Sequence, residues 1–181
     1  MKTASSNVDH LPLSRYLSFP LLLPSEMKHR LGIVTLGSPN LPCPIGAVDI
    51  TGGALRATNT RFPGAYFSDK LFYVTAAGNA VTSRWSIANE LAWASLPTTA
   101  SSMVPESLQK IAHWSYLQVS GKGRGCGDGI VPVSIAHLEG AIQINLEKVF
   151  HAAELHSSWY GSDGILDEWF GSVSHILENI A

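Results

Sequence analysis

Two ionisable side chains in this sequence have the types and the order needed to activate a nucleophile. Asp128 lies in the segment Gly127-Asp-Gly-Ile-Val-Pro132, and His151 follows in the segment 148–154. Both segments are expected to be loops, and in α/β sheets the chemistry is carried by loops beyond the carboxyl ends of the strands. A histidine can take the proton from a serine hydroxyl while a buried carboxylate fixes its tautomer. We therefore predict that Asp128 is the catalytic acid and His151 the general base.

A serine nucleophile is missing from this pattern. The nucleophile elbow of such enzymes needs Gly-x-Ser-x-Gly, which occurs nowhere in the 181 residues. Ser38 follows a glycine at the end of a strand pattern, but Pro39 comes next and the second glycine is absent, so we expect a turn there. Ser162 precedes a terminal helix pattern and is expected to cap it. The sequence thus predicts an acid and a base without a nucleophile.

No metal or cofactor site is predicted, and the remaining polar residues are given structural roles. His151, Glu154 and His156 do not have the spacing of a zinc-binding helix. The glycine-rich stretch 121–129 lacks the glycine spacing and the Lys-Ser/Thr pair of a phosphate loop. His137 is expected to support the neighbouring loop that contains the acid.

Composition excludes several classes of function. Charged residues make up only 14% of the chain, against about 25% in an average soluble domain. A net charge of −2 gives no basic field for nucleic acid, and no apolar stretch reaches the roughly 18 residues of a membrane span. Cys43 and Cys126 form no metal motif and favour reduced thiols. We expect a soluble, intracellular protein that has no clear targeting signal and is not an integral membrane protein.

Periodicity in the sequence predicts an α/β fold. Three short apolar runs have the pattern of buried strands in a parallel sheet, at 31–37, 71–77 and 141–146. Residues between about 82 and 118 have helical periodicity. Residues 38–66, which contain four prolines and four glycines, are expected to be mostly loop. Strands that alternate with helices indicate an α/β arrangement with flanking helices.

The two ends of the chain differ in pattern. Residues 1–30 lack periodicity and are interpreted as a poorly ordered leader, while 31–181 are expected to form one partial α/β domain. Three strands leave apolar edges that need covering. The chain ends in an amphipathic helix pattern, whose expected core stripe is Ile165, Leu166, Trp169, Phe170, Val173, Ile176 and Leu177.

Several separate blocks of the sequence resemble one enzyme family. The blocks are Thr35-Leu-Gly-Ser-Pro39, Gly127-Asp-Gly-Ile-Val-Pro132, Ala136-His-Leu-Glu-Gly-Ala141 and Trp159-Tyr-Gly-Ser162. They look like the C-terminal half of plant and cyanobacterial serine α/β-hydrolases, which are lipase-like and distantly similar to GPI inositol-deacylases. The resemblance covers roughly residues 31–178. It implies that Asp128 and His151 are the triad acid and base, in the chain order of that family, with an ester or lipid-like small molecule as substrate.

The departures from that family shape the functional hypothesis. Its first strands, nucleophile elbow and oxyanion hole should precede residue 31, and residues 1–30 do not resemble them; Asn40 stands where the family usually has histidine. We therefore expect a truncated serine hydrolase, inactive alone, whose parent activity is ester hydrolysis. One alternative is a non-catalytic binding or interaction module on the same half-fold. Another is a partner chain that supplies the elbow. The resemblance is compatible with a chloroplast location.

Overall fold

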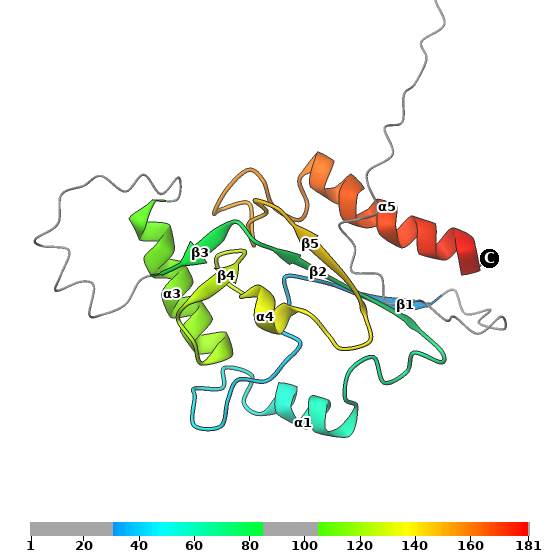
Figure 1. The fold of residues 1–181 in the computed structure, drawn as a ribbon, viewed down its shortest axis with the longest axis horizontal. Coiled ribbons are helices and arrows are strands. Elements are labelled where there is room, and N and C mark those ends of the chain that lie inside the picture. Colours follow the sequence, from blue (N-terminus) through cyan, green and yellow to red (C-terminus); the bar gives the residue numbers. More distant parts are fainter. Residues whose placement is uncertain (1–30, 85–104, 181) are drawn as a thin grey trace, which may run out of the picture.

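The computed structural model describes residues 31–84 and 105–180, which form a mixed α/β structure (Figure 1). Three strands make a parallel sheet in the order β1-β2-β5. Their bounds are β1 Gly32–Leu36, β2 Phe72–Gly78 and β5 Ile142–Leu146. The three predicted strands are confirmed to within one residue at each end, and so is the α/β class with its parallel sheet.

The central strand β2 is buried on both faces. Val74 and Ala76 belong to the core on one face, and Thr75 and Ala77 are buried on the other. This two-sided burial explains why β2 reads as a continuous apolar run rather than an alternating one. β1 is an edge strand of the sheet, and its Ile33 is 42% exposed.

Helix α5 (Asp163–Ile180) covers the face of the sheet that carries Val74 and Ala76 (Figure 1). Five members of the predicted stripe pack into this core: Ile165, Trp169, Val173, Ile176 and Leu177. The other two, Leu166 and Phe170, are largely exposed. Their inclusion was wrong because the sheet contacts a narrower strip of the helix than its full apolar arc.

A second, antiparallel pair of strands lies next to α3 (Glu106–Ser120). The strands are β3 Val81–Ser83 and β4 Gly125–Gly127. The helix predicted within 82–118 is therefore correct for 106–118 and wrong at its start, where residues 82–83 pair with β4. Residues 85–104 of that prediction lie outside the described residues. The glycine-rich stretch 121–129, expected to be loop, contains β4.

Two short helices were not predicted from the sequence: the first lies in a region expected to be mostly loop, and no element was predicted for the second. Helix α1 (Ala54–Arg61) has no buried residue and therefore carries no apolar stripe that could reveal it. The Asp49 side chain accepts the backbone N–H groups of Thr51 and Gly53 and shapes the turn before α1. Helix α4 (Val133–Ala136) follows the acid-bearing loop and packs on the face of β2 opposite α5 (Figure 1).

Two further features concern membrane-spanning helices and the cysteines. No helix in residues 31–84 and 105–180 combines the length and apolar character needed to cross a membrane. Both cysteines are free; Cys43 is buried and Cys126 is exposed.

Candidate acid–base site

The predicted acid and base meet beyond the carboxyl ends of the parallel strands. Asp128 directly follows β4 and lies against Gly78, the last residue of β2. His151 follows β5 after a short loop, and its backbone N–H donates to the carbonyl of Asp128 at 2.9 Å. Their side chains are joined as well, with 2.9 Å between His151 Nδ1 and Asp128 Oδ2. The structure therefore brings together the two residues that the sequence singled out.

The Asp128 carboxylate is held by four hydrogen-bond donors and is 1% exposed. Its Oδ1 accepts the backbone N–H groups of Ile130 at 2.9 Å and Val131 at 2.7 Å. Its Oδ2 accepts the Tyr160 hydroxyl at 2.9 Å in addition to His151 Nδ1. Burying a charged carboxylate is unfavourable unless hydrogen-bond donors replace the water that it loses. The loop, the tyrosine and the histidine together supply those donors.

His151 is oriented by this carboxylate. An ionised carboxylate only accepts hydrogen bonds, so the ring proton of the neutral imidazole lies on Nδ1 and leaves the Nε2 lone pair free to accept a proton. The hydrogen bond that His151 donates to Asp128 raises the pKa of His151; burial lowers it, and the charge of Asp128 raises it further. The side chain is 34% exposed. His151 is thus a strengthened base that is still open to a reactant.

Glycines at two strand ends make room for this pair. A Cβ on Gly37, just after β1, would lie 2.5 Å from Asp128 Oδ2 and 2.8 Å from the Tyr160 hydroxyl. Gly37 also has φ +55°, a region that favours glycine. A Cβ on Gly78 would overlap the carbonyl oxygen of Val149 and lie 3.0 Å from the Cβ of Asp128. The backbone at these two strand ends therefore approaches the side chain of Asp128 more closely than a residue with a Cβ would allow.

Tyr160 is the member of the site that the sequence did not reveal as functional. It lies in the Trp159-Tyr-Gly-Ser162 block, which was noted only as part of the resemblance. A tyrosine next to tryptophan reads as core, and this one is indeed buried. A second buried tyrosine, Tyr116 of α3, binds the same loop, but through the backbone N–H of Gly129 at 3.0 Å rather than the carboxylate.

The serines considered from the sequence do not reach the base. The Ser38 hydroxyl donates to the Leu36 carbonyl at 3.4 Å, as expected of a turn residue. Ser162 begins α5 differently from the predicted cap: its carbonyl accepts the first helical N–H groups, whereas its hydroxyl bonds the Trp159 backbone. Among residues 31–84 and 105–180, no serine hydroxyl is hydrogen-bonded to His151.

The remaining predicted residues lie outside the pair. His137 bridges two strands, with Nδ1 2.9 Å from the Thr75 hydroxyl and Nε2 3.0 Å from Asn145 Oδ1. It supports the sheet next to α4 instead of binding the acid itself. His156 stacks on Phe150. The described residues contain no cluster of side chains that could hold a metal ion, and Glu154 is therefore not part of one.

Asn40, which occupies the position where the resemblance leads one to expect histidine, is a structural link. Its Nδ2 donates to the Ala136 carbonyl at 2.6 Å, which ties the loop after β1 to the end of α4.

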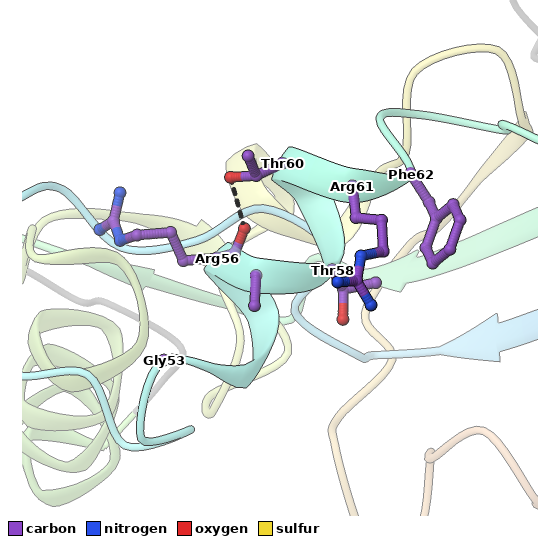
Figure 2. Close-up of a pocket in the computed structure, with 7 residues that line it drawn as sticks. Gly53, Arg56, Thr58, Thr60, Arg61 and Phe62 are labelled. Carbon is purple, nitrogen blue, oxygen red and sulfur yellow. Dashed lines mark hydrogen bonds between the residues drawn. The ribbon is translucent and has the colours of Figure 1, made fainter.

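A surface hollow of about 710 Å³ lies along α1, and all of its lining residues fall within 53–62, far from the acid–base pair in the sequence. Arg56, Thr58, Arg61 and Phe62 are among its lining residues (Figure 2). None of its lining residues contacts Asp128 or His151 through a hydrogen bond. This hollow is therefore not part of the candidate site.

Comparison with known proteins adds no relative: no protein-family model, no curated protein and no solved structure matches this chain.

Proposed function

We propose that this chain carries the acid–base half of a serine ester hydrolase of the α/β-hydrolase class, whose parent substrate is a lipid-like ester. The observation that carries the proposal is the hydrogen bond between the buried Asp128 carboxylate and a partly exposed His151, at the carboxyl edge of a parallel sheet. The chain order of acid before histidine also agrees with that class.

The geometry supports a defined sequence of proton movements. With Nδ1 bound to Asp128, the Nε2 atom of His151 takes the proton of a serine hydroxyl placed about 2.6–3.2 Å away. The serine oxygen attacks the ester carbonyl, and the carboxylate stabilises the imidazolium that forms. His151 then returns the proton to the departing alkoxide as the acyl-enzyme forms. A water molecule, deprotonated by His151 in the same way, releases the acid and restores the serine.

The nucleophile and the oxyanion hole are not supplied by a Gly-x-Ser-x-Gly elbow in this chain. We therefore expect no ester hydrolysis by the chain on its own, because an acid and a base without a nucleophile give little acyl transfer. We assign the nucleophile elbow to sequence encoded upstream or to a partner chain. A partner of that kind would have to place its serine beside the exposed side of His151.

The first experiment measures the chain alone. Purified protein is incubated with p-nitrophenyl butyrate and, separately, with a fluorophosphonate that labels activated serines. We expect neither turnover above the buffer rate nor covalent labelling. Turnover that is lost on phosphonate treatment and in His151→Ala would contradict the missing nucleophile.

The second experiment supplies the missing half. The transcript upstream is read for an in-frame Gly-x-Ser-x-Gly, and the extended chain is expressed and assayed with the same ester. Asp128→Asn should lower kcat by about 10⁴-fold, as expected when a triad carboxylate is lost, and His151→Ala should also abolish most of the activity. The control is His156→Ala, an exposed histidine of the same loop that does not bind the acid. An upstream sequence without an elbow, with no complementing chain, would favour the non-catalytic binding module instead.

A further inference from the structure

The Tyr160 hydroxyl is held on both sides within the site. It accepts the backbone N–H of Gly78 at 2.7 Å and lies 2.9 Å from Asp128 Oδ2. Because the hydroxyl oxygen already accepts a hydrogen at Gly78, its own hydrogen is directed at the carboxylate. Burial, followed by the charge of Asp128, raises the pKa of Tyr160, so the hydroxyl stays protonated and remains a donor.

Tyr160 and His151 both lie in the connection 147–162 between β5 and α5, but Tyr160 is also anchored in the core. Its ring belongs to the core between the sheet and α5, and its carbonyl accepts the indole N–H of Trp169 at 2.9 Å. The ring meets His151 edge to face, with 6.4 Å between centroids. Tyr160 therefore reaches the acid from the buried core, whereas His151 reaches it from the partly exposed side of the same connection.

Tyr160 and His151 share one oxygen of the acid. The backbone N–H groups of the loop hold Oδ1, and these two side chains divide the charge on Oδ2. A donor that takes part of that charge weakens the attraction between the carboxylate and the imidazolium. The same donor, together with the backbone bonds, prevents the carboxylate from rotating away from the ring.

We propose that Tyr160 is a positioning residue for the acid–base pair, which fixes the Asp128 carboxylate and moderates the basicity of His151. The inference deepens the proposed hydrolase function and rests on it only in treating His151 as the base. Within residues 31–84 and 105–180, the charged and titratable groups that interact with the pair are Asp128 itself, Tyr160 from the segment before α5 and Tyr116 from α3.

The test is an NMR titration of the His151 ring in the full chain, which requires no ester turnover. The His151 signal is assigned by its absence in His151→Gln. In Tyr160→Phe the carboxylate keeps more charge for the imidazole, so the pKa of His151 should shift upward while the ring proton stays on Nδ1. Site-specific 3-fluorotyrosine at position 160, a more acidic and stronger donor, should shift the pKa downward.

The matched control is Tyr116→Phe, which removes a buried hydroxyl of α3 that binds the same loop at Gly129 and does not bind the carboxylate. It should leave the titration of His151 unchanged. An unchanged or lowered pKa in Tyr160→Phe, an equal shift in Tyr116→Phe, or an upward shift with 3-fluorotyrosine would overturn the proposal. If Tyr160→Phe does not fold, the fluorinated side chain, which keeps the shape of tyrosine, decides the question. Failure of the hydrolase proposal would appear separately, as inactivity of the extended chain with this titration pattern intact.

Discussion

Replacing Asp128 with asparagine tests how much the buried carboxylate contributes to the free energy of unfolding. The substitution keeps the size of the side chain but exchanges one acceptor oxygen for an amide nitrogen that donates. Because the carboxylate is buried and receives four hydrogen bonds, the change cannot be absorbed by solvent. We expect the variant to be less stable and its histidine to be a weaker base.

The magnitude follows from the four donors. The amide oxygen can still accept the N–H groups of Ile130 and Val131 at the Oδ1 position. At the other position, His151 can move its proton to Nε2 and accept from the amide. The Tyr160 hydroxyl already accepts from Gly78 and is left without an acceptor for its hydrogen. A lost hydrogen bond to a charged group costs roughly 1.5–3 kcal/mol, so we expect the free energy of unfolding to fall by about 2 kcal/mol.

The loss should also depend on pH, because the folded pair binds a proton more tightly than the unfolded chain. The hydrogen bond donated to Asp128 raises the pKa of His151 above its ordinary value of 6.5. The stability that comes from this raised pKa is fully present below 6.5 and is lost as the pH rises through the folded value. The gap between wild type and Asp128→Asn should therefore be widest just below pH 6.5 and narrow at higher pH.

Urea unfolding followed by tryptophan fluorescence at several pH values measures both effects. Asp69→Asn is the control, since it makes the same chemical change at an exposed aspartate in the loop before β2. Equal losses in the two variants, or a gap that widens with rising pH, would refute the reasoning.

Three further predictions concern the frame around the pair. Gly37→Ala should destabilise the fold more than Gly46→Ala in urea unfolding. Both glycines have positive φ, but only at Gly37 would the new Cβ contact Asp128 and Tyr160. Equal losses of stability would mean that the backbone conformation alone, and not this contact, makes the substitution unfavourable. Ile33→Lys on the exposed edge strand should reduce aggregation, measured by light scattering, with an unchanged circular dichroism spectrum; unchanged scattering would count against that edge as the aggregation site. Leu146→Ala, at a fully buried position, should lower the free energy of unfolding by roughly 2–5 kcal/mol, and a loss below 1 kcal/mol would contradict its place in the core.

The sequence alone located the strands and the candidate acid–base residues. Apolar runs ended by glycine located β1, β2 and β5 because strands buried on both faces leave a local signature. Asp128 and His151 were found by residue type, chain order and position in loops. Helix α1 and strand β3 were missed: the helix buries no residue, and the pairing of Val81–Ser83 with β4 is set by residues more than forty positions away.

Only the tertiary structure decided how the acid is held. Tyr160 reaches Asp128 across 32 positions of sequence, and Gly37 and Gly78 approach the same side chain from the ends of two different strands. No local pattern encodes these contacts, because they depend on where α5 packs on the sheet and on how closely the strand ends converge. The sequence could name an acid and a base; the packing of α5 and the strand ends supplies the donor that positions them.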